Sequence, residues 1–104
     1  MGNERREIKV KMQDQLAGGV YANALQISHT KEEFIMDFLM IAPPVGATAG
    51  STTGAVTARV ITSPGHMKRI LSAIQDNIRR YEKSFGEIRQ ADEPESHGHI
   101  GFIS

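Results

Sequence analysis

The sequence predicts an α+β fold: a four-stranded antiparallel meander followed by one long C-terminal helix, in the order β-β-β-β-α. Two observations support this prediction. Between residues 64 and 85, apolar side chains recur at alternating spacings of four and three, as they do in an amphipathic helix. Upstream, short apolar or alternating segments are separated by polar and glycine-rich breaks, which is typical of strands. We expect two layers, a sheet with the helix on one face.

The strands follow from the apolar pattern and from the breaks between them. Residues 14–19 connect the first two strands, and residues 29–32 have the polar character and the length of a hairpin loop. Pro43 and Pro44 end the third strand, because proline has no backbone N–H to donate to a sheet. The four predicted strands are residues 8–13, 20–28, 33–42 and 55–62.

The third predicted strand is apolar on both faces. Ile35, Leu39 and Ile41 share one face with Asp37, and the other face carries only phenylalanine and methionine. A strand of this kind has to be covered on both sides, and the single predicted helix can cover only one side. We therefore expect a partner subunit to cover the second side.

The helix is predicted at residues 64–85. Ser63 is expected to cap its first turn, Pro64 suits the first helical position, and Gly86 suits the residue that ends a helix. In its second half the apolar face narrows to a seam with 3.5-residue spacing, which favours pairing with another helix; a helix lying on its own sheet is the alternative. The prediction is a homo-oligomer, a dimer or a tetramer. Its expected contact surface comprises Phe34, Met36, Phe38, Met40, Leu71, Ile74, Ile78, Tyr81 and Phe85.

Length and composition limit the functions that the protein can have. A chain of 104 residues fits one domain, predicted at residues 7–88, with a frayed start at 1–6, a flexible Gly/Thr-rich loop at 43–54 and a polar tail at 89–104. Twelve basic and twelve acidic side chains cancel, so no net charge attracts nucleic acid or an anionic membrane. The sequence has no cysteine, no apolar run of membrane-spanning length and no secretory signal, and we predict a cytoplasmic protein.

Three polar residues lie in the middle of predicted strands: Asn23, Asp37 and Arg59. They form either a cluster that binds a ligand or a structural group. In the structural interpretation, Asp37 and Arg59 form a buried ion pair and Asn23 completes its hydrogen bonds. We favour the structural interpretation.

The start of the helix offers a second candidate. Backbone N–H groups at a helix N-terminus attract anions, and Ser63, Gly65, His66, Lys68 and Arg69 lie together there. An anion site is one hypothesis, and simple capping by Ser63 explains most of the same residues. A basic helix face for nucleic acid is another hypothesis, partly neutralised by Asp76 and Glu82. That face comprises Lys68, Arg69, Arg79, Arg80 and Lys83.

The C-terminal tail carries two further candidates. His97 and His99, with Glu93 or Glu95, could bind a transition metal, although two histidines on a tail lack a preformed third ligand. We predict no metal site. The apolar tip at residues 100–103 could add as a strand to a neighbouring subunit.

Two segments resemble a known family. YANALQISHTKEEFIMDF and ARVITSPGHMKRILSAIQDNIRRYEKSFGEI are similar to the prokaryotic family called domain of unknown function 3467, over about residues 20–43 and 58–88. This resemblance brings no activity with it. The predicted architecture also resembles that of SecB-like export chaperones, which are homotetramers that bind unfolded chains. That resemblance implies a chaperone or adaptor function.

No catalytic constellation is recognisable in the sequence: there is no nucleophile elbow, no metal-binding helix pair and no carboxylate pair with a positioned base. We therefore predict a protein that is not an enzyme and has no cofactor. The preferred function is a non-catalytic homo-oligomer that acts through protein contacts, with unfolded or peptide segments as partners. Nucleic-acid binding and small-anion binding are the alternatives.

Overall fold

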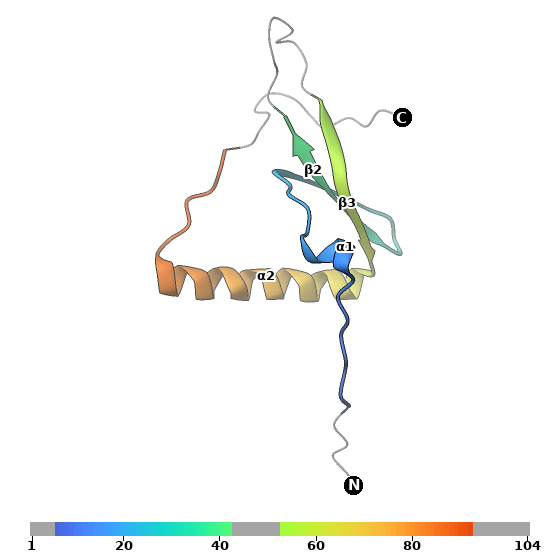
Figure 1. Cartoon of the computed structure of the whole chain (residues 1–104), viewed down its shortest axis with the longest axis horizontal. Coiled ribbons are helices and arrows are strands. Elements are labelled where there is room, and N and C mark those ends of the chain that lie inside the picture. Colours follow the sequence, from blue (N-terminus) through green and yellow to red (C-terminus); the bar gives the residue numbers. More distant parts are fainter. Residues whose placement is uncertain (1–5, 43–52, 93–104) are drawn as a thin grey trace, which may run out of the picture.

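The computed structural model describes residues 6–42 and 53–92, and the chain is an α+β fold over these residues (Figure 1). A three-stranded antiparallel sheet with the order β1-β2-β3 is followed by a long helix. This confirms the predicted class, the meander and the C-terminal helix. The elements are α1 (Asp14–Ala17), β1 (Ala24–His29), β2 (Phe34–Ile41), β3 (Gly54–Thr62) and α2 (Pro64–Phe85).

The prediction of a fourth strand at residues 8–13 was wrong. These residues form no strand in the structure, and Ile8, Val10 and Met12 are largely exposed. Alternation shows which side chains would share a face, but a strand also needs a neighbour with free backbone groups. Because β2 already pairs on both sides, only the outer edges of the sheet remain for such a strand. The predicted connection at 14–19 contains the single helical turn α1.

The hairpin between β1 and β2 is closed by Thr30. Its backbone N–H donates to the carbonyl of Glu33 at 2.9 Å. The Thr30 hydroxyl oxygen accepts the backbone N–H groups of Glu32 and Glu33, each at 3.2 Å. This turn sets the register, in which Ile27 pairs with Met36 and Gln26 with Asp37.

Strand β3 pairs with β2 but contains an irregularity. Phe38 pairs with Ala58, whereas the next residue, Leu39, pairs with Val56, so Thr57 is an extra residue on β3. The Thr57 hydroxyl donates to the carbonyl of Phe38 at 3.1 Å. Such a β-bulge bends the strand and interrupts pairing along it.

Helix α2 begins and ends where its capping residues predict. The Ser63 hydroxyl accepts the backbone N–H of His66 at 3.2 Å, and Pro64 occupies the first turn. At the other end Gly86 has φ 104°, a conformation that favours glycine, and its N–H donates to the Glu82 carbonyl at 2.9 Å. Since both caps are read from local sequence, the helix bounds were predictable to the residue.

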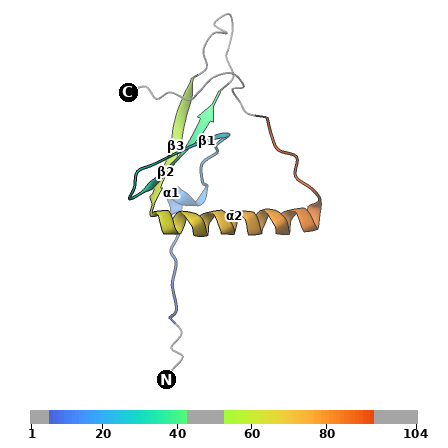
Figure 2. The same cartoon turned by 180° about the vertical axis from the view of Figure 1, so that it is seen from behind.

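The helix meets the sheet at one end only. It starts directly after β3, and both views show its C-terminal half extending away from the strands (Figures 1 and 2). The buried core of the described residues is therefore small. Met36, on the face turned toward α2, is 7% exposed and Leu39, on the opposite face, is 4% exposed.

The burial of Leu39 shows how much of the face of β2 opposite the helix is covered by the chain itself. The face of β2 opposite the helix was expected to need a partner subunit, yet Leu39 and Asp37 are buried there in the single chain. On the same face, Val56 and Ile61 of β3 remain exposed, so the single chain covers the centre of this face and leaves its β3 side open.

Several predictions concern residues outside the described part of the chain. The predicted loop at 43–54 lies there apart from its last two residues, as do residues 1–5 of the predicted frayed start. The histidines of the tail and its apolar tip, within residues 93–104, also lie outside it. Within the described ranges, neither helix has the length and apolar character needed to cross a membrane.

Candidate protein-interaction surface

A groove separates the sheet from the first half of α2. Its volume is about 470 Å³, and all but one of its lining residues are uncharged. The sheet contributes Leu25, Ile27, Phe34, Met36, Phe38 and Val60, and α2 contributes Pro64, Met67, Lys68, Ile70, Leu71 and Ile74. Pockets of this size and character bind apolar groups.

The two walls of the groove do not close on each other. Met36 on β2 is buried, but Leu71 and Ile74 on α2 are each 52% exposed. A helix that packed tightly on the sheet would bury these side chains, because interiors are packed without voids of this size. The groove is therefore an apolar surface that the chain leaves uncovered.

The second half of α2 has no sheet opposite it at all. Ile78, Tyr81 and Phe85 are 43%, 52% and 76% exposed. The rings of Tyr81 and Phe85 lie 4.9 Å apart, so they form one aromatic patch. These three residues continue the apolar positions of the first half, and we call the whole row the helix seam: Met67, Leu71, Ile74, Ile78, Tyr81 and Phe85.

The structure divides the predicted contact surface into three parts. Phe34, Met36, Phe38, Leu71 and Ile74 come together around the groove. The C-terminal part of the helix seam stands free. Met40 belongs to neither, because it lies beyond the bulge and is not among the residues that line the groove.

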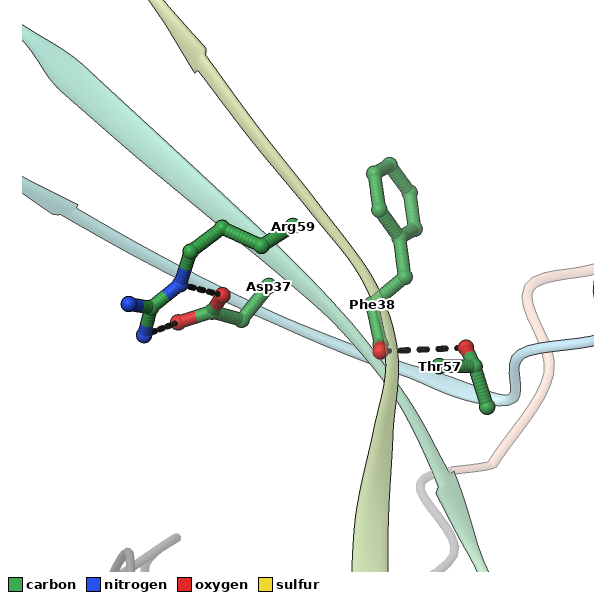
Figure 3. A network of polar contacts seen from close by, with 4 residues as sticks. All are labelled: Asp37, Phe38, Thr57 and Arg59. Atoms are coloured by element: carbon green, nitrogen blue, oxygen red, sulfur yellow. Dashed lines mark hydrogen bonds and ion pairs between the residues drawn. The ribbon is translucent and has the colours of Figure 1, made fainter.

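The opposite face of the sheet is held by the predicted ion pair between Asp37 and Arg59 (Figure 3). Arg59 Nε donates to Asp37 Oδ1 at 2.6 Å and Arg59 Nη2 donates to Asp37 Oδ2 at 2.9 Å. The two residues are cross-strand neighbours in the register of β2 and β3, which explains the bidentate geometry. The pair joins the central strand to β3.

The pair is asymmetric in its exposure to water. The Asp37 side chain is 4% exposed and the Arg59 side chain is 55% exposed. The hydrogen bonds from Arg59 hold the pKa of Asp37 below its ordinary value, against a smaller opposing effect of desolvation. The same hydrogen bonds raise the pKa of Arg59. Arg59 therefore keeps a nearly buried carboxylate charged.

The predicted place of Asn23 in this cluster was wrong. Asn23 lies one residue before β1 and binds the backbone of Ile41: its Nδ2 donates to the Ile41 carbonyl at 3.0 Å, and its Oδ1 accepts the Ile41 N–H at 2.8 Å. The side-chain amide thus replaces one backbone unit at the end of the strand pair. Asn23 stabilises the sheet margin and makes no contact with the ion pair.

Gln26 is the residue of this face that the sequence analysis missed. It pairs with Asp37 in register, and its Oε1 is buried without a hydrogen-bond partner among the described residues. Alternation placed Gln26 beside Ala24, but only the register between β1 and β2 shows that it shares a row with Asp37 and Arg59. That register could not be read from the sequence.

The other candidate residues have local structural roles. Ser63 is occupied as the helix cap, and the His66 N–H is its donor, which matches the capping interpretation. On the basic face, Arg80 pairs with Asp76 at 2.8 Å, four residues apart on the helix. Among the described residues, no three His, Asp or Glu side chains lie close enough together to hold a metal ion.

Comparison with known proteins identifies a family. A family profile described as protein of unknown function (DUF3467) matches residues 1–90, a range that includes both helices and all three strands of the described structure. No curated protein and no solved structure matches the chain.

Proposed function

The chain belongs to the DUF3467 family, and we propose that it is a non-catalytic homo-oligomer that binds extended segments of other protein chains. One observation carries the proposal. Within the described residues, two apolar side chains are buried as a core, whereas eighteen large apolar side chains remain exposed. Apolar surface on this scale marks sites of protein contact.

Two sets among the exposed apolar residues suit different partners. The groove and the helix seam are broad and apolar, as surfaces between subunits are. The second set precedes and includes the edge strand β1. It comprises Leu16, Val20 and Tyr21, together with Leu25 and Ile27 of β1, whose side chains also line the groove.

Strand β1 is the better of the two sheet edges for binding a peptide backbone. An edge strand offers free N–H and C=O groups to an added strand, and proteins block this with lysine, proline or a bulge. In the described sheet, β3 carries a bulge at Thr57, whereas β1 has the regular, uncharged sequence ALQISH apart from its terminal histidine. Extended segments of a client chain could pair with β1, which is the SecB-like part of the proposal.

Self-association is tested by light scattering. The expected result is a mass at least twice that of one chain at micromolar concentration, because the groove and seam need cover. A monodisperse monomer across the accessible concentration range would contradict the homo-oligomer.

Client binding is tested by fluorescence anisotropy with a permanently unfolded test protein, reduced and carboxymethylated. We expect binding that Ser28→Lys weakens, since a lysine on β1 discourages strand addition. The control Ser72→Lys places the same charge on α2 and should leave binding unchanged. If added salt abolishes binding of the test protein to both variants, the binding is electrostatic and does not use the edge of β1. Tight binding of nucleic acid at low salt in a filter assay would favour the nucleic-acid alternative.

A further inference from the structure

We infer that two copies of the chain pair through α2 in antiparallel orientation, so that the second half of each helix fills the groove of the other copy. The inference rests on the self-association proposed above and names the surface that performs it. It follows from three observations: the position of the groove along α2, the register of the helix seam, and the charges beside it.

The position of the groove selects the antiparallel arrangement. The first half of α2 lies opposite its own sheet, and the second half extends away from the strands (Figures 1 and 2). A parallel pair would bring both sheets to the same end of the two helices. An antiparallel pair brings the bare half of each helix to the groove of its partner. Both copies then use the same surface, as a two-fold dimer requires.

The helix seam is complementary to itself in one antiparallel register. When Ile74 of one helix lies opposite Ile78 of the second copy, Leu71 lies opposite Tyr81 and Met67 opposite Phe85. Every seam residue therefore meets a seam residue, and each contact occurs twice. Small and large side chains also alternate across the pair, because the two aromatic residues face Leu71 and Met67.

The charges beside the seam fit the same register. Lys68 is the only charged residue among the described residues that line the groove. In this register it lies beside Glu82 of the second copy. The Glu82 Oε2 accepts the Ile88 N–H at 2.8 Å within its own chain, which leaves the other carboxylate oxygen available to Lys68 of the second copy. Lys68 and Glu82 flank the seam on the same side, and a parallel pair would not bring the same flanks of the two helices together.

The occupant also suits the groove chemically. The incoming half-helix carries Ile78, Tyr81 and Phe85 on one face, and the groove floor contains Phe34, Met36 and Phe38. Aromatic and methionine side chains pack well against one another. The dimer thus covers the apolar surface of both partners without leaving a charge unpaired in the groove.

Cross-linking tests the register directly, because the chain has no cysteine of its own. In the proposed register the two-fold axis of the dimer passes next to Gln75, so this residue lies beside Gln75 of the second copy. Gln75→Cys should therefore be linked in high yield by a thiol cross-linker of about 10 Å, the distance between packed helix axes. Lys68→Cys alone and Glu82→Cys alone should not link, since identical residues are separated by roughly 21 Å along the helix. A mixture of the two variants should link.

Charge exchange gives a second readout. Lys68→Glu and Glu82→Lys should each raise the dimer dissociation constant roughly tenfold, because two attractive pairs become repulsive. The double variant should restore the original constant. Neither recovery nor a mixed cross-link is expected for any other arrangement of α2.

The outcomes separate this inference from the proposal on which it rests. A dimeric mass with no Gln75→Cys link overturns the antiparallel pairing and leaves self-association intact. A monomeric mass overturns both. A dimeric mass with a Gln75→Cys link and a charge-exchange rescue is the expected result.

Discussion

Strand β2 and the second half of α2 both carry large apolar side chains, and these lie in opposite surroundings. β2 lies between two strands, and Met36, Asp37 and Leu39 at its centre are buried. The second half of α2 extends away from the strands, and its seam residues are about half exposed or more. The difference shows that a large apolar side chain is buried within one chain only where the fold gives it neighbours. The first region stabilises the subunit, and the second is available for a partner.

The largest loss of stability is expected when a buried apolar side chain of β2 is truncated. Leu39→Ala should lower the free energy of unfolding by about 2–5 kcal/mol, because it deletes buried atoms and leaves a cavity. Urea denaturation in dilute solution measures the loss. A cost below about 1 kcal/mol would mean that the centre of β2 is not the core of the subunit.

The ion pair between β2 and β3 allows its two partners to be compared with each other. Arg59→Met leaves the Asp37 carboxylate buried without a partner, whereas Asp37→Asn leaves a half-exposed guanidinium that water can solvate. We therefore expect a larger drop in melting temperature for Arg59→Met than for Asp37→Asn. Equal drops would show that the exposure of the two partners does not matter.

The same pair makes the stability of the sheet depend on pH. Because the pKa of Asp37 is lower in the folded state than in the unfolded state, its contribution is complete above the ordinary aspartate value. It is lost as the pH falls through the folded value. The difference in unfolding free energy between the parent and Asp37→Asn should therefore shrink as the pH falls below about 4. A constant difference over that range would contradict the lowered pKa.

The cap of α2 has a smaller expected effect. Ser63→Ala removes the acceptor for the His66 N–H and should cost about 0.5–2 kcal/mol. Ser72→Ala makes the same change in the exposed middle of the helix and should be neutral or slightly stabilising. Thermal melts of the two variants measured side by side decide the matter; similar losses would mean that the cap is not used.

The smallest effect belongs to the exposed half of the seam. In dilute solution, where single chains dominate, Ile78→Ala should change the free energy of unfolding by less than about 0.5 kcal/mol. At high concentration the same variant should lose stability relative to the parent, because the parent gains from dimerisation. Urea curves at two concentrations measure this; a concentration-independent cost would place Ile78 in the subunit core.

Local sequence signals predicted what depends on local structure. The caps at Ser63 and Gly86 gave both ends of α2, and the hairpin at Thr30 was visible as a polar break. The pairing of Asp37 with Arg59 followed because both were mid-strand and opposite in charge. The strand predicted at residues 8–13 failed because alternation describes one segment and pairing needs two.

Features set by the angle between elements were not predictable. The groove exists because α2 leaves the sheet after its first turns, and no residue pattern encodes that angle. Alternation groups Asn23 with Leu25 and Ile27, which line the groove, and the sequence does not show that Asp37 lies on the other face of the sheet. The seam of α2 was recognised from its spacing, but its separation from the sheet is a property of the folded chain.

The claim that the second half of α2 serves another copy is tested most directly by light scattering on a matched pair of variants. Ile78→Asp places a charge in the helix seam, and Ser72→Asp places the same charge on the opposite side of α2. At high micromolar concentration, the parent and Ser72→Asp should have at least twice the mass of one chain, and Ile78→Asp should have the mass of one. A single-chain mass for the parent, or an unchanged mass for Ile78→Asp, would contradict the account.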